Sequence, residues 1–103
     1  MSLERVLKTL EAFGLSRTDA KVYVYLSKKG PKRVRELAEA LQLTRRQLYL
    51  CLKKLKNKSL VTASPERPRV YSAVAFEEVL DLLIRFKMEQ AEALKTKKAV
   101  NHT

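Results

Sequence analysis

Two short amphipathic helices, separated by only a few residues, constrain the fold of this chain most. Apolar residues recur at helical spacing within 32–41 and predict the first helix. Thr44 and Gln47 stand three residues apart, as in a capping box, and predict that a second helix runs over 44–58. Two such helices joined by a short turn are expected to form a helix-turn-helix unit.

Further helices are predicted on both sides of this unit, and a β-hairpin follows it. Gly30-Pro31 ends one of these helices, and β-branched and aromatic runs on either side of Pro65–Arg69 predict the hairpin. The remaining expected elements are helices at 2–13, 16–29 and 76–98, and strands at 60–64 and 70–74. This order predicts a mainly α (α+β) fold, a winged helix-turn-helix domain over 1–75 with a long C-terminal dimerisation helix over 76–103.

The second helix of the unit has an unusual charge. Residues 44–58 carry six Lys and Arg side chains and no acidic one. Surface helices usually mix both signs, because like charges four residues apart repel. A capped helix with positive charge alone is expected to meet a polyanion, and its size suits the major groove of DNA.

The outer face of this helix is where contacts with DNA are expected. Leu48, Leu52 and Leu55 point toward the core with Cys51 beside them, which leaves the opposite face free. In a helix-turn-helix the N-terminal half of this helix meets the base edges, and Arg46 is best suited to bidentate contact with guanine. For any one residue, contact with phosphate or exposure to solvent stays open. The predicted contact residues are Thr44, Arg45, Arg46, Gln47, Tyr49, Leu50 and Lys53.

Two more groups of cations flank this helix in the sequence. Lys32, Arg33 and Arg35 open the helix expected at 32–41, where free N–H groups and the helix dipole attract phosphate. Arg67 and Arg69 lie near the tip of the predicted hairpin, where they either enter a narrow minor groove or belong to a solvated turn.

The positive charge is concentrated in the middle of the chain. Residues 28–69 hold thirteen Lys and Arg side chains against three acidic ones, whereas the rest of the chain is nearly balanced at nine against eight. A general role in solubility predicts an excess that is spread out. This concentration instead predicts a nucleic acid partner, or less often an anionic membrane surface.

Other classes of protein are disfavoured by what the sequence lacks. No apolar run approaches the ~18–20 residues of a membrane span, and the first residues do not resemble a signal peptide. The single cysteine, Cys51, has neither a second cysteine nor a nearby histidine for a metal site. The sequence contains no nucleophile–base set and no Gly-rich phosphate loop, so neither an enzyme nor a cofactor is expected. We expect a cytoplasmic protein associated with the nucleoid.

The C-terminal helix has more apolar surface than one core requires. Its apolar residues spread over roughly 200° of the helical wheel, about twice the stripe that docks on a single core. The simplest partner for the surplus is the same helix of a second subunit, although a helix that folds back on its own domain stays open. The residues predicted at a dimer interface are Val79, Leu82, Leu83, Phe86 and Leu94.

Three motifs resemble the archaeal TrmB-type transcriptional regulators. Residues 14–23 (GLSRTDAKVY) are similar to the opening of that family, 34–52 to its helix-turn-helix, and 60–74 to its wing. The resemblance implies a sequence-specific DNA-binding regulator that dimerises through the helix after the wing. Ser59 stands where the family often has Gly, and Leu50 where a polar residue is common.

The sugar-sensing domain that full-length members often carry is not expected, because the chain ends at residue 103. Any small-molecule effector is unknown and would have to bind at the dimer interface. The leading hypothesis is a homodimeric, sequence-specific regulator of double-stranded DNA. The alternatives are a non-specific nucleoid-type DNA-binding protein and a winged helix that serves only as a protein-interaction module.

Overall fold

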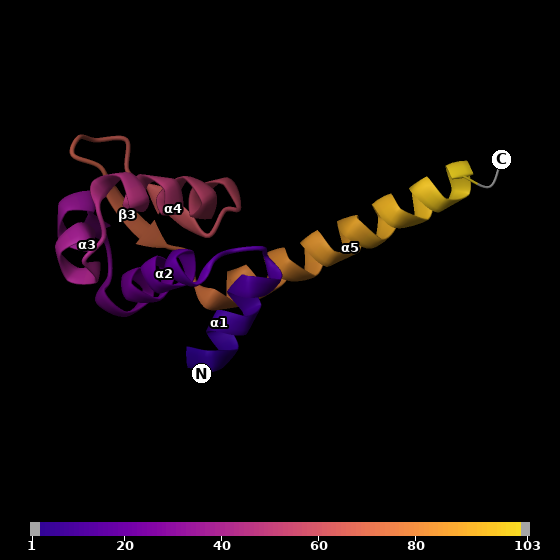
Figure 1. The fold of residues 1–103 in the computed structure, drawn as a ribbon, viewed down its shortest axis with the longest axis horizontal. Coiled ribbons are helices and arrows are strands. Elements are labelled where there is room, and N and C mark those ends of the chain that lie inside the picture. Colours follow the sequence, from indigo (N-terminus) through magenta and orange to yellow (C-terminus); the bar gives the residue numbers. More distant parts are fainter. Residues whose placement is uncertain (1–2, 102–103) are drawn as a thin grey trace.

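The computed structural model describes residues 3–101, with side chains described as far as Lys95, and contains five helices and a small sheet within those residues. In chain order the elements are α1 (Leu3–Ala12), α2 (Arg17–Lys29), β1 (Lys32–Arg33), α3 (Val34–Leu41), α4 (Arg45–Asn57), β2 (Val61–Ala63), β3 (Val70–Ala73) and α5 (Phe76–Asn101). The first four helices and the sheet form one body, from which α5 projects (Figure 1). The expected winged helix-turn-helix with a long C-terminal helix is confirmed.

The structure corrects the start of the helix that was predicted at 32–41. Residues 32–33 form β1, in which Lys32 lies opposite Tyr71 and Arg33 opposite Val70. The sheet therefore has three strands in the order β1-β3-β2, rather than the two of the predicted hairpin. Helix α3 begins only after Arg33, whose extended backbone N–H donates to Glu36 Oε1 at 3.1 Å.

The second helix, α2, lies at the centre of the fold. Its start is fixed by a capping box, in which Asp19 N–H donates to Ser16 Oγ at 3.1 Å and Ser16 N–H donates to Asp19 Oδ2 at 2.9 Å. Tyr23 is buried and donates its hydroxyl to the carbonyl oxygen of Val74 at 2.6 Å, which ties α2 to the end of the sheet. Leu3, at the start of α1, is 49% exposed.

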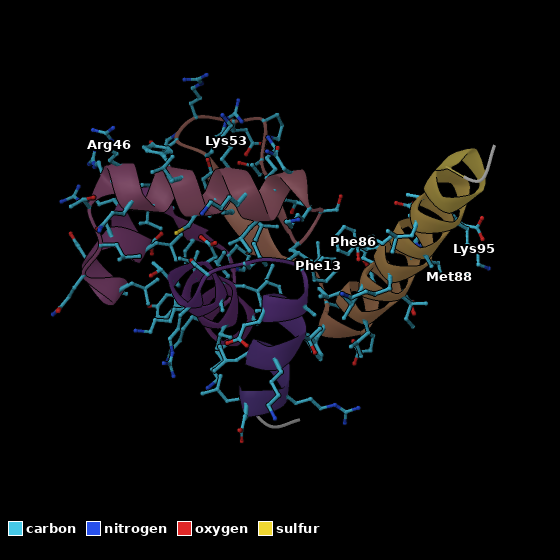
Figure 2. The ribbon with its side chains drawn as sticks, turned by 45° about the vertical axis from the view of Figure 1, so that its right-hand side comes forward. Phe13, Arg46, Lys53, Phe86, Met88 and Lys95 are labelled. Atoms are coloured by element: carbon cyan, nitrogen blue, oxygen red, sulfur yellow. The ribbon has the colours of Figure 1, made fainter. Side chains whose placement is uncertain are left out.

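The base of α5 docks on the body through a few apolar contacts. Val79 is fully buried, and the Phe86 ring stacks on Phe13 with 5.8 Å between ring centroids. Lys58, just beyond α4, places its Nζ 5.3 Å from the Phe86 centroid. Figure 2 shows these rings facing each other, with Met88 farther out along α5.

Beyond this base, α5 leaves the body of the molecule. The molecule measures 55 × 29 × 22 Å, and its radius of gyration is 16.0 Å. A compact domain of this length has a radius of gyration of about 13 Å, so the difference reflects the projecting helix. Among the described residues, no helix combines the length and the apolar character that a bilayer span requires.

Candidate nucleic-acid interface

Helix α4 lies on the surface of the body with its start firmly capped. Thr44 Oγ1 accepts the N–H of Gln47 at 3.1 Å, and Gln47 Oε1 accepts the N–H of Thr44 at 2.9 Å. Leu48, Leu52 and Leu55 are buried beneath the helix, as the sequence predicts. Because these two polar side chains already hydrogen-bond to the backbone, we assign Thr44 and Gln47 first to fixing where α4 begins.

The opposite face of α4 is open to solvent. Arg45, Arg46 and Lys53 are exposed, and Tyr49 and Leu50 are 53% and 55% exposed. Figure 2 shows Arg46 and Lys53 extending away from the core. This face therefore presents cations, which can bind base edges, and two side chains with apolar surface, which can contact thymine methyl groups.

A hollow of about 300 Å³ brings the three predicted groups of cations together. It is lined by the β1–α3 junction, by the first turns of α4 and by the wing, which is the loop between β2 and β3. Its lining residues are Arg33, Val34, Arg35, Arg45, Tyr49, Pro68 and Arg69. Four arginines from segments far apart in the sequence thus line one hollow together with a tyrosine.

Some predicted contact residues lie outside this hollow. Arg67 is exposed at the tip of the wing, next to a cis peptide bond to Pro68, and does not line the hollow. Lys32 is half-buried in β1, so it does not open a helix as was predicted. Arg35 forms an exposed ion pair with Glu39 at 3.6 Å, which is worth only about 0–1 kcal/mol and leaves its charge available to another anion.

A buried carboxylate on α2 contacts α4 on the side that faces the core. Asp19 on α2 is 1% exposed, and its Oδ2 lies 3.6 Å from Lys54 Nζ on α4. Burial opposes ionisation, but hydrogen bonds from Cys51 and Ser16, together with the charge of Lys54, hold the pKa of Asp19 below its ordinary value. Asp19 is therefore an anion at neutral pH that connects the capping box of α2 to α4.

Cys51 is buried between these elements, as the sequence predicts. Burial, followed by the neighbouring carboxylate of Asp19, raises the pKa of its thiol to about 12. A thiol of this kind is a poor nucleophile and a poor metal ligand at neutral pH. Within the described part of the chain, no three His, Cys, Asp or Glu side chains gather in a way that could hold a metal ion.

Several residues of the candidate interface were not predicted from the sequence. Val34 and Pro68 line the hollow, and Asp19 and Lys54 set the position of α4. Glu36, three residues after Arg33, is a capping-box signal that marks the true start of α3. The Asp19–Lys54 pair has no such local signal, because its two members are 35 positions apart.

Residues 10–77 match the model of a family described as "Sugar-specific transcriptional regulator TrmB". The chain is also similar to the HTH-type sugar sensing transcriptional regulator TrmBL1 of Pyrococcus furiosus, with 28% identity over 92 residues. That match covers 89% of this chain but only 27% of the length of TrmBL1.

Solved structures show the same fold. The structure of TrmBL2, described as an archaeal chromatin protein with a novel mode of DNA binding, matches with a TM-score of 0.82 and 28% identity, over 99% of this chain and 40% of that one. The ST1889 protein of the archaeon Sulfolobus tokodaii matches with a TM-score of 0.74 and 24% identity, over 89% of this chain and 99% of that one, a likeness of fold alone.

Proposed function

We propose a function from one premise: this chain belongs to the TrmB family of transcriptional regulators, whose model covers its winged helix-turn-helix. We infer that the protein is a sequence-specific regulator that binds double-stranded DNA as a homodimer, in the cytoplasm and associated with the nucleoid. TrmBL1 and TrmBL2 are named for regulation and for DNA binding, which supports a DNA partner for this chain. The proposal assigns no reaction and no cofactor to the protein.

The hollow between β1–α3, α4 and the wing is the observation that carries this proposal. Arg33, Arg45 and Arg69 are exposed and converge there, and a guanidinium group binds phosphate bidentately. The neighbouring outer face of α4 carries Arg46 and Leu50 toward solvent. In this arrangement phosphate contacts fix the position of the protein, and the outer face of α4 reads base edges in the major groove.

The projecting part of α5 supports a homodimer. Val79, Leu82 and Phe86 face the body, whereas Ile84 and Leu94 are exposed and lie about 140° and about 60° from Val79 around the helix axis. Because Val79 is fully buried within its own chain, it is withdrawn from the predicted dimer interface, and Leu82, Leu83 and Phe86 already pack partly on the core. The free stripe consists of the exposed residues Ile84, Met88, Ala91 and Leu94, with the half-buried Leu80 at its base.

The salt dependence of DNA binding tests the interface. If each subunit of a dimer neutralises about five phosphates, the slope of log affinity against log salt is about −9. The double variant Arg45→Gln and Arg69→Gln removes two contacts per subunit and is expected to bring the slope to about −5, at about 0.9 per contact. Fluorescence anisotropy with a labelled duplex over a salt series measures both values.

A charge-matched control separates these contacts from general electrostatics. Lys8→Gln with Arg85→Gln removes the same charge from α1 and α5, away from the hollow. The control should keep the slope of the parent protein. An equal reduction in the two double variants, or no binding of duplex DNA at low salt, would show that the hollow is not the phosphate-binding surface.

A second candidate function has one observation in its favour. TrmBL2, which matches nearly the whole of this chain, is described as a chromatin protein, so a non-specific nucleoid-type role is the alternative. Selection from a pool of random duplexes distinguishes the two functions. Enrichment of a palindromic motif with half-sites about one helical turn apart supports the regulator, and an unenriched pool that is still bound supports the nucleoid protein.

The oligomeric state tests the role of α5. Ile84→Glu places a charge in the free stripe and is expected to convert a dimer into a monomer in light scattering, because the charge would lose its hydration in the interface. Arg85→Glu places the same side chain one position away, on the polar side of the helix, and should leave the dimer intact. A monomeric parent protein at micromolar concentration would contradict the proposed homodimer.

A further inference from the structure

A second hollow, separate from the one beside the wing, has no part in the proposed DNA binding. It has a volume of about 390 Å³ and lies between α1, α2 and the end of α3. It shares no lining residue with the hollow beside the wing. Its lining residues are Leu3, Leu7, Arg17, Lys21, Val24, Tyr25, Lys28 and Leu41.

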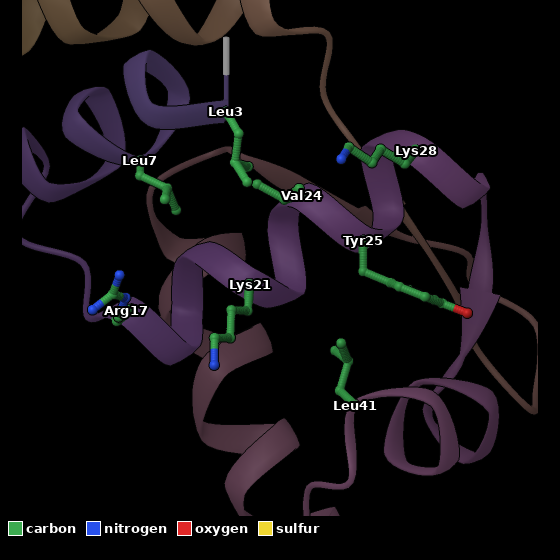
Figure 3. A pocket seen from close by; sticks show the side chains of 8 residues that line it. All are labelled: Leu3, Leu7, Arg17, Lys21, Val24, Tyr25, Lys28 and Leu41. Carbon is green, nitrogen blue, oxygen red and sulfur yellow. The ribbon is translucent and has the colours of Figure 1, made fainter.

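The walls of this hollow are apolar side chains that no other part of the described chain covers. Figure 3 shows Leu3 and Leu7 extending from α1 toward Val24, with Leu41 reaching toward α2 from the end of α3. Leu3 is 49% exposed, and Val24 and Tyr25 are only half-buried. The volume of the hollow falls within the range of small-molecule sites, about 300–1,000 Å³.

An adjoining hollow extends the apolar surface along α1 and α2. It has a volume of about 230 Å³ and shares Leu3, Val24 and Lys28 with the first. Phe76 and Val6 add to its walls. The two hollows together provide room for an elongated apolar body rather than for an inorganic ion.

The rim of the hollow is positively charged and unpaired. Arg17, Lys21 and Lys28 lie on one face of α2, and none of them forms an ion pair within the part of the chain whose side chains are described. Arg17 and Lys21 are four residues apart, so their charges repel. The hydroxyl of Tyr25 forms no hydrogen bond with another described residue, although it is half-buried.

We propose that this hollow binds a small organic carboxylate with an aromatic or aliphatic body. Arg17 and Lys21 on the rim hold the carboxylate, and the leucine and valine side chains cover the body. This site lies within one subunit, whereas the sequence alone places any effector at a dimer interface. The proposal does not depend on the proposed DNA-binding function.

Leu41 places the proposed site next to the turn between α3 and α4. Leu41 is the last residue of α3, and the turn that leads to the Thr44 cap of α4 follows it directly. Gln42, the next residue, is in the left-handed conformation with a φ of 54°. A ligand in contact with Leu41 therefore lies against the turn of the helix-turn-helix.

Titration of the full chain with 4-phenylbutyrate tests the proposal, followed by amide chemical shifts in ¹H–¹⁵N spectra. A ligand of this size is expected to bind at about millimolar concentration, with shifts at Leu7, Val24 and Leu41. The uncharged analogue 4-phenylbutanol should bind about tenfold more weakly, because it gains nothing from the cations. Inorganic phosphate should not displace 4-phenylbutyrate, because it has no apolar body.

Matched variants complete the test. Arg17→Gln with Lys21→Gln should raise the dissociation constant of 4-phenylbutyrate about tenfold, whereas Lys8→Gln with Lys29→Gln removes the same charge elsewhere and should leave it unchanged. Equal binding of the acid and the alcohol would overturn the role of the cations. Shifts that map to α5 or to the wing, or their absence at tens of millimolar, would overturn the site itself.

Discussion

Ser59 occupies a backbone position that suits glycine, and its replacement makes a quantitative prediction. Its φ is 64°, in the left-handed region, at the residue after the C-cap of α4. Leu60 N–H donates to Leu55 O at 2.9 Å, and Ser59 N–H donates to Lys56 O at 3.0 Å. These two bonds form a Schellman motif, which is the usual place for glycine. Helix α1 ends with the same pair of bonds around Gly14, whose φ is 83°.

The expected change in stability follows from this geometry. A non-glycine residue in the left-handed conformation costs about 1–2 kcal/mol, and Ser59→Gly removes that cost. Glycine loses about 0.5–1 kcal/mol more on folding through its greater freedom in the unfolded chain. Ser59 is exposed and its side chain makes no hydrogen bond with another described residue, so no contact is lost. The net gain is about 0.5–1 kcal/mol in the free energy of unfolding.

Urea denaturation at a fixed protein concentration measures this gain as a higher midpoint with an unchanged slope. Ser72→Gly, in the extended strand β3, is the matched control and should lower the free energy of unfolding by about 0.5–1 kcal/mol. Gly14→Ser should be destabilising, because it creates the strain that Ser59 carries now. A neutral or destabilising Ser59→Gly, measured beside these two, would refute the reasoning.

Three further predictions concern the recognition helix and its support. Asp19→Asn should lower the free energy of unfolding at neutral pH by about 1.5–3 kcal/mol, the value of a hydrogen bond to a charged group. Because the pKa of Asp19 is lowered by folding, this deficit should shrink as the pH falls below about 4 and the parent protein loses the charge, which chemical denaturation at several pH values measures. Cys51 has a thiol pKa of about 12, so it should resist alkylation by iodoacetamide at pH 8 in the native protein and react in urea. Mass spectrometry follows the labelling, and rapid labelling of the native protein would contradict the burial of Cys51. Leu50→Ala should change the free energy of unfolding by less than about 0.5 kcal/mol, since the side chain is 55% exposed. In anisotropy titrations it should weaken binding to selected DNA more than binding to random duplexes. An equal loss of affinity for both would show that Leu50 does not read the sequence.

The parts of the fold that the sequence predicts correctly are the ones fixed by neighbouring residues. Thr44 and Gln47 cap α4 as expected through contacts only three residues apart, and Ser16 and Asp19 cap α2 in the same way. Gly30 ends α2 with a φ of 85°, again through local geometry. Such features depend on the chain within one helical turn, and that information is present in the sequence.

The parts that sequence reasoning got wrong depend on distant residues. Strand β1 is only two residues long and exists because Tyr71 and Val70 pair with it from nearly forty positions away. Val79 and Leu94 belong to the same apolar pattern, yet one is fully buried and the other 68% exposed, because the body ends before α5 does. A helical wheel shows that α5 has more apolar surface than one core requires, but not which part of that surface packs on the body.

The unbroken course of α5 turns residue counting into a geometric constraint. Its base is anchored at Phe86, and each further residue rotates the helix by 100° and advances it by about 1.5 Å. One residue inserted after Phe86 would turn Met88 and Leu94 by more than a quarter of a turn relative to α4. Seven inserted residues would restore the orientation to within about 20° and lengthen the arm by about 10 Å. An insertion of one heptad would therefore extend the reach of this arm and turn its outer residues by only about 20° relative to α4.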